Sequence, residues 1–354
     1  MKSRHSLRWA IAVALLSMLA ACGGSSEGSD SGLKTVNFGG QGVTADAGLY
    51  VADAMGYFED EGLELKYNRL TDASAITNSL ATGHLDVAGA TITPGTFEAA
   101  KQDLGIKIVG DKNFMKPPSG DLPAMSGTRL AVLPQYDKGD LGATFEALKG
   151  KKLAIHSNLS IQIVYLGMLL EKYGFSLDDF EITPVLSPDQ TAALKGGSID
   201  AAVMQEPYFS AAVADGTVKP VSDMTEELPE DGASTTALLY GRDFMEDKET
   251  AEKFMVAYMK GVRTYNDAMF YGKDKDKVVD IIAEATDVPS EQIASTFPPG
   301  LDPDQNISLD WLAVCEEFYQ ENGMFDGDVD PADMVDTSFR DHAIDELGEY
   351  EPPA

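Results

Sequence analysis

Two stretches far apart in the chain follow the same pattern. Residues 80–94 read LATGHLDVAGATITP, and residues 194–207 read LKGGSIDAAVMQEP. In each, a leucine ends a helical run, a glycine suited to a left-handed backbone follows, and an aspartate precedes four small or apolar residues. Such a run is typical of a buried parallel strand, and the proline after it suits the first turn of another helix. The repeat predicts two α/β lobes built alike.

The rest of the chain alternates strands and helices at short spacing, which indicates parallel sheets covered by helices on both faces. We expect two doubly wound lobes joined by two crossing segments. Lobe I comprises residues 33–128 and 237–354, and lobe II comprises residues 129–236. Strands are predicted at 34–38, 63–67, 87–90, 106–110, 129–133, 152–156, 181–185, 201–204 and 235–240. Residues 111–126 are predicted to be irregular and residues 246–354 to be mainly helical. The strands at 129–133 and 235–240 are predicted to cross between the lobes.

The first 21 residues are typical of a secretory signal. Lys2, Arg4 and Arg8 precede an apolar run, residues 9–21, that is too short to span a bilayer. The run ends in Leu-Ala-Ala followed by Cys22, which resembles the lipobox of bacterial lipoproteins. That resemblance implies cleavage before Cys22 and lipidation of its thiol. An ordinary secretory signal is the alternative.

A short polar segment follows the predicted signal. Residues 22–32 are rich in glycine and serine, so we expect a flexible tether. No later stretch is apolar enough to cross a bilayer, so the expected location is extracytoplasmic, with the protein anchored to the membrane by the lipid on Cys22.

The chain is strongly acidic. It has 27 Lys and Arg residues against 58 Asp and Glu, a formal charge of −31, and loss of the three basic residues in the signal changes the charge to −34. This charge excludes nucleic acid as a partner. The second cysteine, Cys315, has no partner for an internal disulfide if Cys22 is lipidated, so we expect it to be a small apolar residue in a helix.

Several short motifs follow one another along the chain: GYF at 56–58, EGL at 61–63, LATG at 80–83 with Asp86, LKGKKLA at 148–154, ALKG at 193–196 with Asp200 and Ala201, EP at 206–207 and VDTSF at 335–339. In this order they resemble the solute-binding proteins of nitrate, sulfonate, taurine and thiamine-pyrimidine importers. The resemblance covers about residues 34–348 and implies a type II periplasmic-binding fold. It also implies a monomer that closes on a small ligand and delivers it to an ABC permease and its ATPase.

Four turns that each end a strand and begin a helix are the predicted ligand site, since ligands of parallel sheets bind at the carboxyl ends of strands. Arg and Lys are absent from all four turns, so an anion would be held by hydroxyls, amides and helix N-termini. Capping of the helices is the alternative role for Asp46, Thr93 and Ser157 or Asn158. The candidate ligand-binding residues are Gln41, Thr44, Asp46, Thr91, Thr93, His156, Ser157, Asn158, Ser160, Gln205, Glu206 and Tyr208.

Glu206 does not decide between two classes of ligand. A carboxylate in the site favours a ligand with an amine or a pyrimidine N–H, whereas a carboxylate that only caps a helix is compatible with a sulfonate or nitrate. Tyr50, Phe97 and Tyr208 could stack on a flat ligand or belong to the core. Asp86 and Asp200 open their strands at the end remote from the site, so we assign them structural roles.

Motifs for catalysis and metal binding are missing from the sequence. It contains no HExxH, no GxSxG and no P-loop, and Pro331 occupies the position where a calcium loop starting at Asp326 would need glycine. We therefore expect neither an enzyme nor a cofactor or metal site. Two other functions remain as alternatives: a ligand-sensing receptor and a pyrimidine-synthesis enzyme of the same fold.

Overall fold

The computed structural model describes residues 32–353 apart from 71, 72, 121, 123 and 231. The predicted signal, the lipidation site Cys22 and most of the tether therefore lie outside the described residues. Leu33–Ala354 forms one compact unit. No helix in the described part of the chain is long and apolar enough to cross a membrane.

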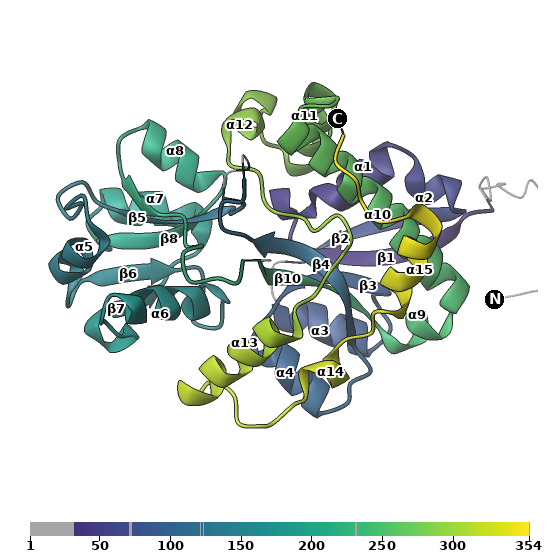
Figure 1. Cartoon of the computed structure of the whole chain (residues 1–354), viewed down its shortest axis with the longest axis horizontal. Helices are drawn as coiled ribbons and strands as arrows, with labels where there is room; N and C mark the ends of the chain where they lie inside the picture. Colours follow the sequence, from purple (N-terminus) through teal and green to yellow (C-terminus); the bar gives the residue numbers. More distant parts are fainter. Residues whose placement is uncertain (1–31, 71–72, 121, 123, 231, 354) are drawn as a thin grey trace, which may run out of the picture. The chain divides into compact units, whose positions relative to one another are not determined.

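In the described part of the chain, ten strands form two five-stranded sheets (Figure 1), with the orders β2-β1-β3-β10-β4 and β7-β6-β8-β5-β9. The strands are β1 Lys34–Gly40, β2 Leu63–Arg69, β3 Val87–Thr91, β4 Lys107–Met115, β5 Thr128–Val132, β6 Lys152–Ile155, β7 Glu181–Pro184, β8 Ala201–Gln205, β9 Lys219–Ser222 and β10 Ala233–Tyr240. The predicted mixed α/β fold is confirmed.

Helices connect the strands and occupy most of the C-terminal third. They are α1 Ala47–Ala54, α2 Tyr57–Asp60, α3 Ala73–Ala81, α4 Pro94–Lys101, α5 Leu141–Leu148, α6 Gln162–Lys172, α7 Ser187–Lys195, α8 Tyr208–Ala214, α9 Arg242–Glu246, α10 Lys248–Tyr271, α11 Lys275–Thr286, α12 Ser290–Ser295, α13 Leu309–Glu321, α14 Pro331–Met334 and α15 Ser338–Leu347.

The two sheets have equivalent topologies. In the first, β1 pairs in parallel with β2 and β3, and β10 runs antiparallel to β3 and β4. In the second, β6 pairs in parallel with β7 and β8, and β5 runs antiparallel to β8 and β9. The repeated sequence pattern supplies corresponding strands, β3 and β8, at the centre of each sheet.

The repeated residues have matching local roles. Gly83 and Gly197 both adopt the left-handed backbone, at φ +69° and +68°. Asp86 accepts a hydrogen bond from the backbone N–H of Asn37 in β1 at 2.7 Å, and Asp200 accepts one from the N–H of Lys152 in β6 at 3.1 Å. Each aspartate therefore fastens its strand to the neighbouring parallel strand.

Residues of each strand alternate between two buried faces. In the second sheet, Leu130, Leu153 and Val203 face the core that contains α5 and α6, whereas the intervening residues Ala131 and Ala154 face the core that contains α7 and α8. The first sheet is likewise buried on both faces, with α3 and α4 on one and α1 and α10 on the other.

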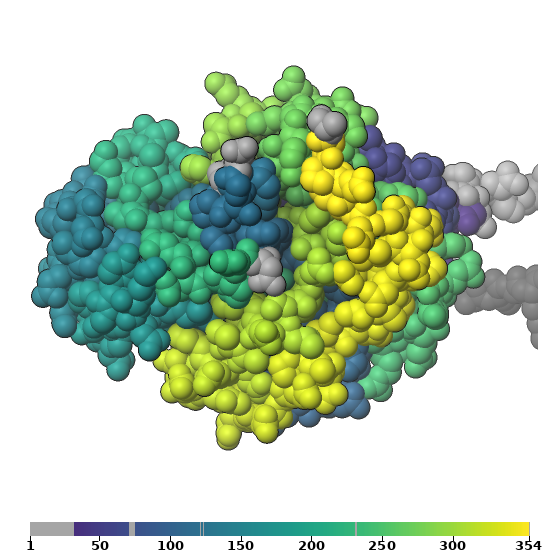
Figure 2. Space-filling model, viewed as in Figure 1, coloured from purple at the N-terminus to yellow at the C-terminus, as the bar shows by residue number. Residues whose placement is uncertain are grey.

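Helix α13 belongs to the core of both sheets. It packs against α4 and α6, and Phe318 lies against Gly167 of α6 so closely that a Cβ there would approach the ring to 2.5 Å. Figure 2 shows the yellow-green surface of this part of the chain beside the teal surface of the second-sheet region. Trp311, which is fully buried in α13, also donates to the backbone oxygen of Ser234 at 2.7 Å.

The predicted boundaries around the passages between the sheets were partly wrong. Residues 111–115 are not irregular but continue β4, because β10 pairs with them through a ladder interrupted by bulges. Neither predicted crossing strand passes between the sheets. The strand predicted at 129–133, observed as Thr128–Val132, lies inside the second sheet, and the strand predicted at 235–240, observed as Ala233–Tyr240, lies inside the first. The chain leaves the first sheet after β4, which ends at Met115, and returns to it after β9, which ends at Ser222. Strand β9 was not predicted.

Candidate functional site

The four predicted turns follow β1, β3, β6 and β8, at the carboxyl ends of the paired parallel strands. Among the described residues, no hydrogen bond or ion pair joins the turns of the first sheet to those of the second. Contacts within each sheet, however, arrange the candidate side chains in defined ways.

Asp46 is buried beneath the first turn. One of its carboxylate oxygens accepts the backbone N–H groups of Gly42 at 2.9 Å and Val43 at 3.0 Å and the hydroxyl of Tyr67 at 2.8 Å. The other oxygen forms an ion pair with Lys112 of β4. The side chain of Asp46 does not cap α1, so the alternative capping role is not observed; the carboxylate holds the shape of the turn instead.

The electrostatics of Asp46 depend on Lys112. Burial alone raises the pKa of the Asp46 carboxyl, but the charge of Lys112 and the hydrogen bonds from Lys112, Val43 and Tyr67 outweigh burial and lower its pKa. The lysine side chain is only 2 % exposed and lies against Gly89 of β3, where a Cβ would approach its Cδ to 2.0 Å. Gly89 therefore makes room for this lysine.

Sequence reasoning missed Lys112 because it predicted residues 111–126 to be irregular. The signal that could have found it is the strand predicted at 106–110, IKIVG, which continues towards the carboxyl edge as β4. Gln41 and Thr44, the other candidates in the first turn, are half-buried.

The second turn is held by the C-terminal part of the chain. Tyr319 of α13 donates its hydroxyl to the backbone oxygen of Ile92 at 3.0 Å, and the N–H of Ile92 donates to Thr235 of β10 at 3.1 Å. Thr93 occupies the position before α4, where its N–H donates to the hydroxyl of Thr96. Thr91 and Thr93 remain half-buried on either side of Ile92.

In the second sheet, Ser187 connects two of the predicted residues. Its backbone N–H donates to His156 Nδ1 at 3.3 Å, and its hydroxyl lies 3.0 Å from the same atom and 3.1 Å from Gln205 Oε1. Because Nδ1 accepts a backbone N–H, the neutral ring carries its proton on Nε2. Burial lowers the pKa of His156, which keeps the ring neutral at pH 7.

Ser187 was also missed. It follows the turn after β7, a third parallel strand whose carboxyl end adjoins that of β6, and the sequence interpretation considered only two strands of this sheet.

The third turn precedes α6 without a side-chain cap. The helix begins at Gln162 because residues 157–160 form a separate turn, so neither Ser157 nor Asn158 caps it. Ser157 accepts the N–H of Leu159 at 3.2 Å, and Ser160 accepts the N–H of Gln162 at 3.3 Å. Asn158 is exposed at the tip.

Glu206 is buried and already has protein partners. Its carboxylate accepts the N–H and hydroxyl of Ser210, at 3.2 and 2.8 Å, and the N–H of Phe297 at 3.4 Å. Burial raises the pKa of Glu206, and the hydrogen bonds and Arg129 oppose this effect. The guanidinium of Arg129 lies 4.3 Å from the centre of the Phe297 ring. These contacts favour a structural role at the start of α8, where Tyr208 is half-buried.

We expect Glu206→Gln to lower the free energy of unfolding by about 1 kcal/mol, because an amide can replace only one of the two accepting oxygens. Ligand affinity should change less than a few-fold. Chemical unfolding and calorimetric titration measure the two effects, with Ser210→Ala as the matched control for the lost helix contact. A large loss of affinity with unchanged stability would show instead that Glu206 pairs with the ligand.

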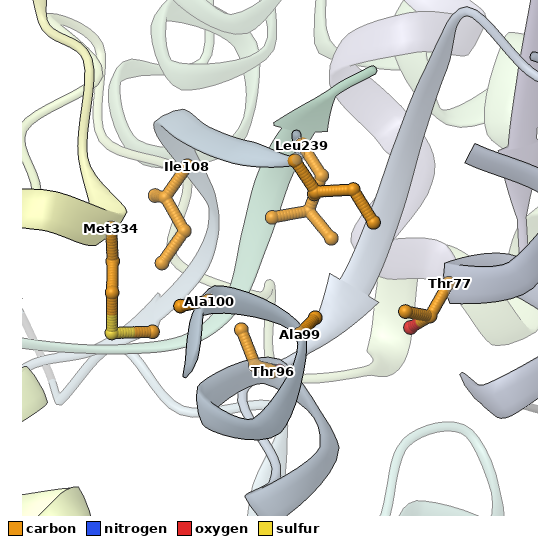
Figure 3. A pocket seen from close by; sticks show the side chains of 8 residues that line it. Thr77, Thr96, Ala99, Ala100, Ile108, Leu239 and Met334 are labelled. Carbon is orange, nitrogen blue, oxygen red and sulfur yellow. The ribbon is translucent and has the colours of Figure 1, made fainter. Parts of the chain in front are cut away.

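The cavity in Figure 3 lies between the first sheet and α4 and has a volume of about 10 Å³. That volume is about the space that one water molecule requires, so this cavity cannot hold an organic ligand. It is lined by Thr77, Thr96, Ala99, Ala100, Ile106, Ile108, Leu239 and Met334. No group of His, Cys, Asp and Glu residues suited to a metal ion occurs among the described residues.

The chain is similar to two curated proteins of different kinds. It is 25 % identical over 348 residues to a putative aliphatic sulfonates-binding protein of Bacillus subtilis, an alignment that covers 95 % of this chain and 96 % of that protein. It is 28 % identical over 159 residues to the 4-amino-5-hydroxymethyl-2-methylpyrimidine phosphate synthase of Aspergillus parasiticus. That alignment covers 44 % of this chain and only 41 % of the synthase.

Solved structures show the same fold. The periplasmic aliphatic sulphonate binding protein of Escherichia coli superposes with a TM-score of 0.67 at 18 % identity, and the match covers 87 % of this chain and 99 % of that one. The profile of the NMT1-like family matches residues 29–283, which is most of the chain. With the two sheets and their equivalent strand-end turns, this match shows that the chain belongs to the NMT1-like family.

Proposed function

We propose that this protein is an extracytoplasmic, lipid-anchored solute-binding protein that captures a small organic sulfonate or a related oxyanion and delivers it to an ABC permease. The ligand would lie at the strand-end turns of the two sheets, between lobes that close around it. The observation that carries the proposal is that both carboxylates in these turns already accept hydrogen bonds from protein groups.

Asp46 and Glu206 are the only acidic residues in the four turns. Both are buried, and both accept hydrogen bonds from neighbouring protein groups, so neither is available to pair with a cationic ligand. The polar groups left for a ligand include the Nε2–H of His156 and the hydroxyls of Thr44 and Thr93. A site composed of neutral donors suits an anion, as the site of an amine would need a free carboxylate.

The similarity to the Bacillus subtilis protein supports the same ligand class, because it extends over nearly the full length of both chains. The similarity to the synthase favours a second candidate, recognition of a pyrimidine. We rank it lower because that match spans less than half of either chain, and because Glu206, the group best suited to a pyrimidine N–H, is occupied by Ser210 and Phe297.

A thermal-shift screen tests this function. The panel comprises methanesulfonate, ethanesulfonate, taurine, nitrate and 4-amino-5-hydroxymethyl-2-methylpyrimidine, each compared with sodium chloride at the same ionic strength. We expect a saturable rise in melting temperature with one or more of the sulfonates. A rise with the pyrimidine alone would favour the second candidate.

A further inference from the structure

None of the four turns contains Arg or Lys. Strand pairing in the first sheet nevertheless places the side chain of Arg69 at the first turn. Arg69 is the last residue of β2, and it pairs with Gly40 of β1 in the parallel register. Its side chain extends along the turn that follows β1 and donates from Nη2 to the backbone oxygen of Gly42 at 3.3 Å. Arg69 is therefore at the carboxyl edge of the first sheet, against Gly42 of the turn that also contains Gln41 and Thr44.

Gly42 is shaped to receive this side chain. The glycine has a φ of +74°, and a Cβ at this position would lie 2.0 Å from Nε and 2.5 Å from Cζ of Arg69. Any other residue would displace the guanidinium from the turn. The guanidinium of Arg69 therefore contacts the backbone of the candidate site at Gly42.

The other two cations near the turns cannot serve a ligand. Lys112 is buried and its charge is offset by Asp46. Arg129 is 6 % exposed, lies under the Phe297 ring and donates to the backbone oxygens of Ser126 and Thr128. Arg69, in contrast, is exposed and forms no ion pair with a carboxylate among the described residues. Only one of its five donor positions has a partner there, the Gly42 oxygen.

The net charge of the protein gives such a cation a role in binding an anionic ligand. A chain with a formal charge of −31 repels small anions at long range, and a local positive potential at the site opposes this repulsion. We propose that Arg69 is the specificity residue that selects anions, by drawing the oxyanion to the first turn and binding it through the free donors of the guanidinium. This inference rests on the proposed function.

The test is calorimetric titration of ethanesulfonate into the wild-type protein, Arg69→Gln, Arg69→Lys and a matched control. The control is Arg242→Gln. Arg242 is also exposed and lies against a left-handed glycine, Gly105. It follows β10, whose last residue pairs with the first residues of β3 and β4, so it lies at the opposite end of the strands from the candidate site. Each titration is performed at low and high salt, and thermal unfolding of each variant without ligand verifies that it is folded.

We expect Arg69→Gln to weaken ethanesulfonate binding by about 10- to 100-fold and to reduce its salt dependence, as is typical for loss of a charged hydrogen bond. Arg69→Lys should recover part of the affinity, and Arg242→Gln should match the wild type. If Arg69→Gln binds within about twofold of the wild type, the role of Arg69 is wrong but the proposed function stands. If the wild-type protein does not bind ethanesulfonate or any other anion of the panel, the proposed function is wrong, and the role of Arg69 with it.

Discussion

Replacement of Lys112 by methionine should lower the free energy of unfolding by about 3–5 kcal/mol, the usual effect of removing one partner of a buried ion pair. The lysine is fully enclosed, and its loss leaves the Asp46 carboxylate buried opposite an apolar side chain. Chemical unfolding at pH 7 measures the change. The control is Lys195→Met, since Lys195 pairs with Asp215 on the surface, where such a pair contributes about 0–1 kcal/mol.

A double variant separates the charge from the packing. In Asp46→Asn with Lys112→Met, no uncompensated charge remains, and most of the lost stability should return. If the double variant is as unstable as Lys112→Met alone, the loss comes from packing against Gly89 and the ion pair does not support the turn.

The loss of stability in Lys112→Met should depend on pH, and its direction follows from the pKa of Asp46. The pKa of Asp46 is lowered in the folded protein, so its contribution to stability is present above the unfolded pKa, near 3.8, and is lost as the pH falls through the folded value. Burial and the charge of Asp302 raise the pKa of Asp111. The ionisation of Asp111 therefore has the opposite effect, because it lowers the stability of the folded protein as the pH rises. The difference between wild type and Lys112→Met should therefore be largest near neutral pH and shrink in acid.

Replacement of Cys22 by serine should move the protein almost completely from the membrane to the soluble fraction. The resemblance to a lipobox implies that the cysteine thiol carries the lipid, and two acyl chains contribute about 0.8 kcal/mol per buried methylene. No helix in the described residues could replace the anchor by crossing the membrane. Fractionation of cells followed by immunoblotting measures the distribution.

Cys315→Ser is the matched control for the anchor. This cysteine is fully buried in α13, so its replacement leaves the proposed lipidation site intact, and the protein should stay with the membrane. Retention of Cys22→Ser in the membrane fraction after a high-salt wash would contradict lipid anchoring through this residue.

Local patterns in the sequence predicted the architecture because each lies within one short segment. The leucine, glycine and aspartate around residues 80–86 and 194–200 specify a helix end, a left-handed turn and a buried strand, and all three occur in both sheets. The structural roles of Asp86 and Asp200 were predicted for the same reason: each opens a strand next to a parallel neighbour.

The site was harder to predict because its contacts join residues distant in sequence. Lys112 reaches Asp46 from β4, Arg69 reaches Gly42 from β2, and Phe297 reaches Glu206 from the segment after α12. An aspartate or glutamate at a helix start looks like a cap or a ligand contact until its partners are known. The absence of Arg and Lys from the turns was a correct observation, but strand pairing brought both residue types to the first turn.

The central claim is that the protein binds a small anion, and the melting temperature in the presence of ethanesulfonate tests it most directly. A ligand at about 100 times its dissociation constant stabilises the folded state by about 2.7 kcal/mol, so binding should raise the melting temperature in a saturable way. Sodium chloride at equal ionic strength should not reproduce the rise. An unchanged melting temperature with ethanesulfonate and every other anion of the panel would contradict the account.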